Sequence, residues 1–174
     1  MSQLTTGLLN LARVSFDDSQ LIIEDVRIDE LLWETKEMLL SQNKDFNIRI
    51  EYLDMPDDPE KLIIPGNKQL LQVALGNIME NACKFSDNKT VDAILKFNPQ
   101  NIQITVIDKG IGIPLNDLQN IFEPFFRAGN ARSYSGSGVG LSLTQKIIKL
   151  HKGTIEISST LNIGTKVLIT LPHR

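Results

Sequence analysis

Apolar residues recur every three or four positions in four stretches of the chain, the spacing that gives an α-helix one buried face. In the first stretch Leu4, Leu8 and Leu11 make a single stripe that ends at a polar segment. Asp29 and Asn67 precede two of the other stretches, where a short polar side chain can accept hydrogen bonds from the first N–H groups of a helix. The spacing therefore predicts helices over residues 1–14, 30–41, 68–85 and 139–150.

Between these stretches, apolar and polar residues alternate over short runs bounded by turn-forming residues, the pattern of a half-buried β-strand. Several of these runs lie in neighbouring pairs, as in hairpins, and helices separate the pairs. We therefore expect an α+β fold in which one mixed sheet is covered by helices on one face. The extended segments predicted are 21–27, 46–53, 62–64, 91–97, 102–107, 154–158 and 166–171.

Size and composition fit a single soluble domain. The chain has 174 residues, of which 41% are hydrophobic and 22% charged, enough apolar material for a core. Its formal net charge of -3 argues against a nucleic-acid partner, which would favour a basic surface. Cys83 is the only cysteine, which excludes a disulfide within one chain and indicates a reducing, cytoplasmic setting. No apolar run approaches the ~20 residues of a membrane span, although a longer parent protein could carry one elsewhere.

Glycines gather between Asp108 and Gly140, in a stretch with little regular pattern. A connection of about 30 residues is too long for an ordinary loop and is usually a functional lid or a disordered segment. We expect a lid at about residues 115–138 that is poorly ordered without nucleotide.

Polar residues with useful chemistry follow one edge of the long helix predicted over 68–85. Asn77, Asn81 and Lys84 come at steps of four and three, with Glu80 beside them. Amide oxygens suit a hard cation such as Mg²⁺, and a lysine can neutralise phosphate. The same arrangement also fits a plain solvated helix face.

Two glycine-containing motifs indicate a nucleotide. Asp108 follows the strand 102–107 and precedes Gly110 and Gly112, so a flat ligand can approach the backbone beside a carboxylate that accepts from an amino group. The run 136–141 carries three glycines at alternate positions before the last helix, where free N–H groups favour an anion such as a triphosphate. Taken singly, the first motif also fits a capped turn and the second a flexible linker.

Two weaker signals complete the set. Three phenylalanines within residues 122–126 should pack locally and anchor one end of the lid, and Arg127 beside them could face phosphate. Gly164 and Thr165, between the last two strands, fit a hairpin turn when taken alone.

In this order and spacing, the motifs resemble the catalytic domain of sensor histidine kinases, a branch of the Bergerat-fold ATPases. The resemblance covers roughly residues 20–172 and implies a two-layer α/β sandwich, with a mixed sheet of about five strands packed on three helices. The segments that carry it are 77–86 for the N box, 108–113 and 136–141 for two glycine boxes, 122–126 for the F box and 164–165 for the final glycine box.

The resemblance implies how ATP would be held at its base. Asp108 would bind the adenine amino group, and Thr165 would support it through water. Gly110 and Gly112 would shape the base pocket. The other residues expected around the nucleotide are Ile113, Phe122, Arg127, Gly136, Ser137, Gly138, Val139, Gly140 and Leu141.

It also implies how the phosphates and the reaction would be managed. Asn81 would ligate Mg²⁺, while Asn77 and Lys84 would contact phosphates. Glu80 would polarise the incoming imidazole, so that Glu80, Asn81 and Lys84 make up the catalytic set.

The implied reaction moves the γ-phosphoryl group of ATP to a histidine on the dimerisation and histidine phosphotransfer domain of a homodimeric parent, which then serves a response regulator. Neither His151 nor His173 is placed as that acceptor. Residues 1–16 resemble the end of the second dimerisation helix, and residues 17–174 the ATP-binding catalytic domain. We therefore expect this chain to bind ATP without phosphorylating itself.

Three rival interpretations use the same boxes. Topoisomerase, mismatch-repair and chaperone ATPases hydrolyse ATP with a glutamate base, and Glu80 is suitably placed for that role. An anti-sigma-factor-type kinase would phosphorylate serine on a partner. The leucine stripe in residues 1–14 and the phenylalanines in residues 122–126 favour the histidine kinase. A degenerate module used only for interactions fits poorly with the intact Asn81 and Asp108.

Overall fold

The computed structural model describes residues 22–173, so the helix predicted over residues 1–14 lies outside the described residues. No helix in the described range is both long and apolar enough to cross a membrane. The elements are, in chain order, β1 (Glu24–Arg27), α2 (Ile28–Gln42), β2 (Asn47–Leu53), the 3₁₀ turn η2 (Pro59–Leu62), β3 (Ile63–Gly66), α3 (Lys68–Phe85), β4 (Ser86–Asn98), β5 (Asn101–Gly110), the 3₁₀ turn η3 (Gly129–Ala131), α4 (Gly140–Leu150), β6 (Thr154–Thr160) and β7 (Gly164–Pro172).

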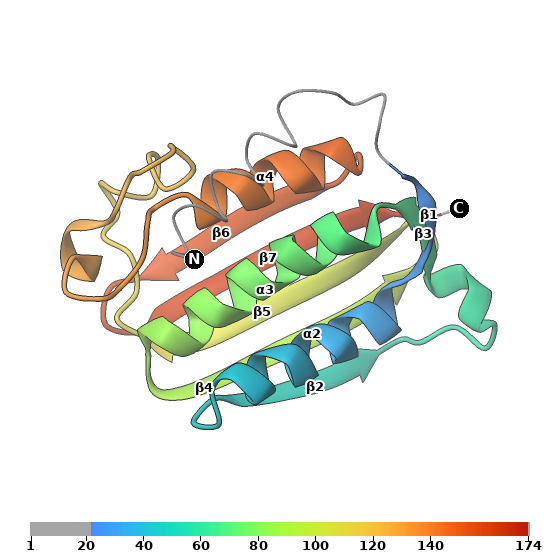
Figure 1. Cartoon of the computed structure of the whole chain (residues 1–174), viewed down its shortest axis with the longest axis horizontal. Helices are drawn as coiled ribbons and strands as arrows, with labels where there is room; N and C mark the ends of the chain where they lie inside the picture. The colour runs from blue at the N-terminus through green and yellow to red at the C-terminus, as the bar shows by residue number, and fades with distance from the viewer. Residues whose placement is uncertain (1–21, 174) are drawn as a thin grey trace.

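A mixed five-stranded sheet forms one layer and helices form the other (Figure 1). The strand order is β2-β4-β5-β7-β6, in which β2 runs parallel to β4 and every other neighbouring pair is antiparallel. Helices α2, α3 and α4 cover the same face of this sheet (Figure 1). The arrangement confirms the predicted α+β sandwich. A separate two-stranded sheet, which pairs β1 with β3, was not predicted.

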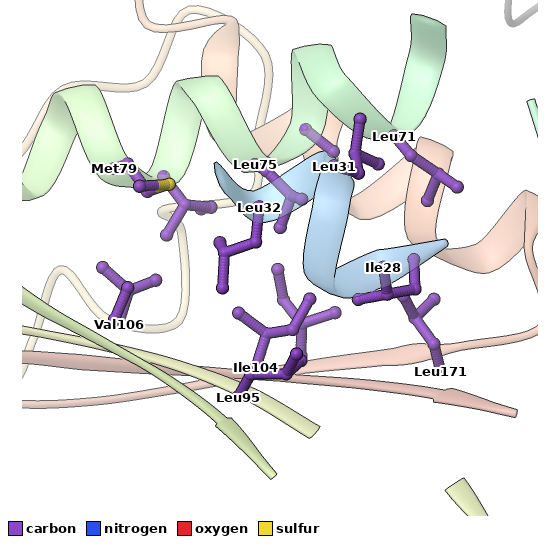
Figure 2. Packing of buried hydrophobic residues seen from close by; sticks show 14 of the residues in the cluster. Ile28, Leu31, Leu32, Leu71, Leu75, Met79, Leu95, Ile104, Val106 and Leu171 are labelled. Atoms are coloured by element: carbon purple, nitrogen blue, oxygen red, sulfur yellow. The ribbon is translucent and has the colours of Figure 1, made fainter. Parts of the chain in front are cut away.

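The core lies between the helices and the sheet (Figure 2). Leu75 of α3 points toward Leu95 and Ile104 of the sheet, and Val106 lies below Met79 (Figure 2); each of these five side chains retains at most 1% of its accessible surface. Burying one such side chain contributes about 1.5–3 kcal/mol, so the apolar stripe of α3 fixes the orientation of its polar edge. The apolar stripe of α3 is buried along its length: Leu71, Ala74, Leu75, Ile78 and Ala82.

Of the two predicted helix caps, one is confirmed and one is wrong. The Asn67 side chain accepts a hydrogen bond from the Leu70 N–H group at 3.0 Å, as an N-cap should. Helix α2 begins at Ile28, two residues earlier than expected, so Asp29 lies inside its first turn. The Asp29 carboxylate instead accepts two hydrogen bonds from the Arg27 guanidinium, at 2.9 and 2.6 Å.

Strands β4 and β5 are longer than the sequence pattern indicated, and the predicted end of the second strand at residue 107, directly before Asp108, is wrong. Strand β5 continues to Gly110, which pairs with Ser86, while Asp108 pairs with Val91. Because side chains alternate along a strand, Asp108 faces the same side as Ile104 and Val106. The carboxylate therefore lies under the helices instead of in an exposed loop.

Candidate nucleotide site

A cavity of about 590 Å³ opens between the polar edge of α3, the end of β5, the segment that joins β5 to α4, and the first turn of α4. Its volume is in the range of about 300–1,000 Å³ typical of small-molecule sites. Figure 1 shows the joining segment, in yellow to orange, beyond the ends of the strands and next to the beginning of α4. The predicted residues that line the cavity are Asn77, Glu80, Asn81, Lys84, Asp108, Gly112, Ile113, Arg127, Gly136, Ser137, Gly138, Val139, Gly140, Leu141 and Thr165.

Asp108 is the buried carboxylate of this cavity. It retains 8% of its accessible surface, and its Oδ1 accepts hydrogen bonds from the N–H groups of Gly110 at 2.9 Å and Thr165 at 3.3 Å. Burial raises the pKa of Asp108, while the two backbone hydrogen bonds act in the opposite direction. Because these two bonds end on one oxygen, the other carboxylate oxygen is the atom best placed to receive a ligand donor.

Two glycines let the backbone close tightly around this carboxylate. A Cβ atom on Gly110 would lie 2.0 Å from the carbonyl oxygen of Phe85, so only glycine allows β5 to pass the end of α3. Gly112 has φ of +63°, and a Cβ there would lie 2.1 Å from the carbonyl oxygen of Thr160. Gly112 lines the cavity. Gly110 does not line it and affects its shape only through the close packing of β5 against the end of α3.

Thr165 belongs to a chain of hydroxyl contacts beside Asp108. Its Oγ1 lies 2.9 Å from the Oγ of Ser159, which accepts a hydrogen bond from the N–H group of Ile113 at 2.8 Å. Ser159 thus ties the loop after β5 to the turn between β6 and β7. Sequence reasoning missed Ser159 because a lone serine directly after a predicted strand carries no distinguishing pattern.

The polar edge of α3 faces the cavity as predicted, and its side chains are already bonded to neighbours. The Lys84 ammonium donates to the Asn81 Oδ1 at 3.3 Å and to the carbonyl oxygen of Ser135 at 3.0 Å. Burial lowers the pKa of Lys84, Glu80 raises it, and Arg127 lowers it. A half-buried cation in this position is well suited to meet an anion.

Asn77 joins α3 to α4. Its amide nitrogen donates to the carbonyl oxygen of Gly140 at 3.3 Å and to the Thr144 hydroxyl at 3.4 Å. Val139, which precedes Gly140, is the N-cap of α4. Within the described chain, no side chain caps this end of the helix and no acidic residue occupies its first turn. The first N–H groups of α4 are therefore available to an anion in the cavity.

The joining segment is held by several hydrogen bonds of its own. The Phe125 N–H group donates to the carbonyl oxygen of Gly138 at 3.0 Å, which closes the segment near its base. Arg127 was expected to face phosphate; in the structure its guanidinium donates to the carbonyl oxygens of Ala131, at 2.9 Å, and Tyr134. Arg127 therefore braces the segment while also lining the cavity.

The phenylalanines of residues 122–126 differ from one another in burial. Phe126 lines the cavity, and Phe122 is half-buried but is not a lining residue. Phe125 keeps 58% of its accessible surface, so the expectation that all three would be packed is wrong for this residue. Its backbone φ is +68°, in the left-handed region, and its N–H group is held by the carbonyl oxygen of Gly138.

The two histidines are engaged elsewhere. The Nε2 atom of His151 accepts from the Asn67 N–H group at 2.9 Å, and its Nδ1 atom lies 2.7 Å from the carbonyl oxygen of Ile147. His173 contacts the carbonyl oxygen of Asn98 at 3.2 Å. With both ring nitrogens bonded and 6% of its surface exposed, His151 joins the beginning of α3 to the end of α4.

Comparison with known proteins decides the family. The profile of the histidine kinase-, DNA gyrase B- and HSP90-like ATPases matches residues 66–174, well over half of the chain. This chain belongs to that family. The matched range contains every cavity residue predicted from the sequence, from Asn77 to Thr165.

Within this ATPase family, the similar proteins are sensor kinases. The sensor-like histidine kinase SenX3 of Mycobacterium bovis is 30% identical over 177 residues, covering 99% of this chain and 42% of the relative. The heme sensor protein HssS of Staphylococcus haemolyticus is 32% identical over 174 residues, covering 99% and 37%. The chain thus spans less than half the length of these relatives.

A solved structure agrees. The mycobacterial sensor histidine kinase MprB superposes with a TM-score of 0.73 at 25% sequence identity, covering 88% of this chain and 99% of that chain. The chain is thus homologous to the ATP-binding catalytic domain of sensor histidine kinases, and the serine kinase alternative is not favoured.

Proposed function

We propose that this chain is the catalytic domain of a two-component sensor histidine kinase, which binds ATP and passes its γ-phosphoryl group to a histidine of the parent protein. One observation carries the proposal. A single cavity brings together a buried carboxylate, a half-buried lysine and the uncapped beginning of α4. The carboxylate suits the adenine amino group, whereas the lysine and the beginning of α4 each suit a phosphate.

The base would be read by Asp108. An ionised carboxylate only accepts hydrogen bonds, so it selects a purine with an amino group over one with a carbonyl at the same place. Thr165 would support the base through water, with Ser159 fixing the direction of its hydroxyl group. Ile113 and Gly112 would form the wall beside the ring.

The phosphates would lie between α3 and the first turn of α4. Lys84 and Asn77 would contact them from α3, and the run 136–141 would supply backbone N–H groups. Among residues 22–173, no three His, Cys, Asp or Glu side chains gather to hold a metal ion. Asn81, whose Oδ1 is already the acceptor for a cation, would therefore hold Mg²⁺ together with phosphate oxygens and water.

Phosphoryl transfer of this kind depends on positioning and charge neutralisation more than on covalent participation of the protein. Lys84 and the α4 N-terminus would neutralise the phosphates, and Glu80 would orient and polarise the incoming imidazole. Neutral imidazole is a competent nucleophile near pH 7, so Glu80 need only hold its proton-bearing nitrogen.

The partners follow from the reaction. The acceptor would be the dimerisation and histidine phosphotransfer domain of a homodimeric parent, and a response regulator would receive the phosphoryl group from it. We place residues 17–174 in the catalytic domain, with a lid at 115–138, and residues 1–16 at the end of a dimerisation helix. ATP supply places the domain in the cytoplasm, whether or not the parent has a membrane anchor.

The test is phosphotransfer with radiolabelled Mg-ATP. The chain alone should acquire no acid-labile label, whereas addition of a polypeptide carrying the parent's phosphotransfer segment should label that polypeptide on histidine. Steady ATP hydrolysis without any phosphohistidine would contradict the proposal and favour a hydrolytic ATPase of the same family.

A further inference from the structure

Asn130 is a polar residue of the cavity that none of the motifs includes. It lies in the 3₁₀ turn η3, inside the segment that joins β5 to α4, and it lines the cavity. Its side-chain oxygen, Oδ1, is buried and has no hydrogen-bond partner among the described residues. Such atoms are uncommon in native proteins because leaving a buried acceptor unpaired costs about 1–3 kcal/mol.

The orientation of the Asn130 amide is fixed by its other end. The amide nitrogen donates to the carbonyl oxygen of Gly112 at 2.9 Å and lies 3.5 Å from that of Ile111. Rotating the amide by half a turn would place its oxygen against two carbonyl oxygens, which repel it. The unpaired end of the Asn130 amide is therefore a hydrogen-bond acceptor, and not a donor.

Two properties of Oδ1 indicate which part of a ligand it would bind: it is a hydrogen-bond acceptor, and its residue is hydrogen-bonded to Gly112. Phosphate groups offer only acceptor oxygens near pH 7 and cannot pair with Oδ1. Gly112 and Ile111, which anchor Asn130, line the same cavity as Asp108, at the end proposed above for the base. The donors of adenosine are the exocyclic amino group and the ribose hydroxyl groups.

We propose that Asn130 is a nucleotide-recognition residue that accepts a hydrogen bond from the adenosine part of ATP, through the exocyclic amino group or a ribose hydroxyl group. This inference rests on the proposed function, since it assigns a further contact within the same site. Asn130 also links the lid to Gly112, so the same side chain joins lid position to the presence of the nucleoside.

The experiment is a calorimetric titration of the full chain and of Asn130→Ala with ATP and three analogues: purine riboside triphosphate, 2′-deoxy-ATP and 3′-deoxy-ATP. Loss of one hydrogen bond to a buried acceptor should weaken ATP binding about tenfold in Asn130→Ala. The analogue that lacks the donor group should bind both proteins with the same affinity.

Gly129→Ala is the matched control. A Cβ atom there meets only the Asp117 carboxylate at 3.8 Å, an ordinary contact, so this variant should keep the affinity of the unaltered chain for ATP. Circular dichroism of all three proteins confirms that each is folded before titration.

Three results would overturn the inference. Asn130→Ala could bind ATP as well as the unaltered chain does. It could lose the same factor for ATP and all three analogues, which would show that Asn130 only anchors the lid. Its defect could vanish when Mg²⁺ is removed with EDTA, which would assign Oδ1 to the metal ion instead. Failure of the unaltered chain to bind ATP at all is a separate outcome, and it would contradict the proposed function first.

Discussion

Asp108 follows Ile104 and Val106 on the side of strand β5 that faces the helices, and the surrounding backbone encloses its carboxylate. Its pKa is raised by burial, so the ionised form is less stable in the folded chain than in water. The sign of the consequence for stability is clear. A raised carboxyl pKa favours the fold below the ordinary pKa, and that contribution is lost as pH rises through the folded-state value.

Replacing Asp108 with asparagine should therefore weaken ATP binding without lowering the stability of the fold at pH 7. In Asp108→Asn, the side-chain oxygen can still accept from Gly110 and Thr165, but no charge is buried. We expect the variant to melt at the same or a higher temperature at pH 7 and to lose its advantage near pH 4. A charged hydrogen bond is worth about 1.5–3 kcal/mol, so calorimetry should show ATP affinity falling about 10- to 100-fold.

Unchanged ATP affinity in Asp108→Asn would remove the base-recognition role from this residue. A lower melting temperature at pH 7 would show that the charge, and not the shape, of the side chain supports the fold.

The buried His151 gives a second prediction, in which the stability of the fold decreases as pH falls. Burial lowers the pKa of His151, and the neutral ring accepts the Asn67 N–H group, a bond that protonation would break. A depressed histidine pKa gives stability that is complete above the ordinary value of 6.5 and is lost as pH falls from there through the folded-state value. Urea unfolding at pH 5, 6, 7 and 8 should show this loss.

The comparison variant for this measurement is His151→Gln, which retains an acceptor and cannot be protonated. Its free energy of unfolding should change less between pH 7 and pH 5 than that of the unaltered chain. Parallel curves for the two proteins would assign the acid sensitivity to other groups.

Single residues also mark the limit of sequence reasoning. The pattern around Asp108, an acid followed by two glycines, predicted a carboxylate beside a ligand, and Asp108 does line the cavity. It did not identify the burial of Asp108, since the need for glycine at position 110 comes from Phe85, which is 25 positions away in the chain. Asn130 was missed altogether because a lone asparagine in a glycine-rich segment has no pattern.

At the scale of elements, the confirmed cap and the residue wrongly predicted to be a cap offer a pair of variants. Asn67→Ala removes the bond to the Leu70 N–H group and should lower the free energy of unfolding by about 1 kcal/mol. Asp29→Ala removes a partly exposed ion pair with Arg27, and such pairs contribute roughly 0–1 kcal/mol. Urea denaturation should thus find the larger loss in Asn67→Ala. Equal losses would mean that α3 does not depend on its cap.

The predicted lid, residues 115–138, should close over the bound nucleotide, and this can be tested by proteolysis. Arg127 and Arg132 lie in the segment predicted to be a lid and offer two trypsin sites. If the segment closes over the triphosphate, Mg-ATP should slow cleavage at both sites, while Asp108→Asn at the same nucleotide concentration should be cleaved as fast as the free protein. Limited proteolysis followed by mass spectrometry measures both. Identical patterns with and without Mg-ATP would argue against closure.

Across the whole molecule, the hydrophobic pattern predicted most helices and strands and the covering of one sheet face. It did not predict that β2 runs parallel to β4 or that β1 pairs with β3. Periodicity reports which face of an element is buried, whereas the choice of a distant strand partner depends on how the whole chain packs. The site could be assembled in advance only because its motifs follow one another at the spacing of a known family.

The central claim is that one ATP molecule lies in this cavity with its adenine at Asp108 and its phosphates at the beginning of α4. A crystal structure of the chain with a non-hydrolysable ATP analogue and Mg²⁺ tests it directly. We predict the adenine amino group within hydrogen-bond distance of the Asp108 carboxylate, and the triphosphate between Lys84 and the run 136–141. A nucleotide bound elsewhere, or placed with its phosphates toward Asp108, would contradict the account.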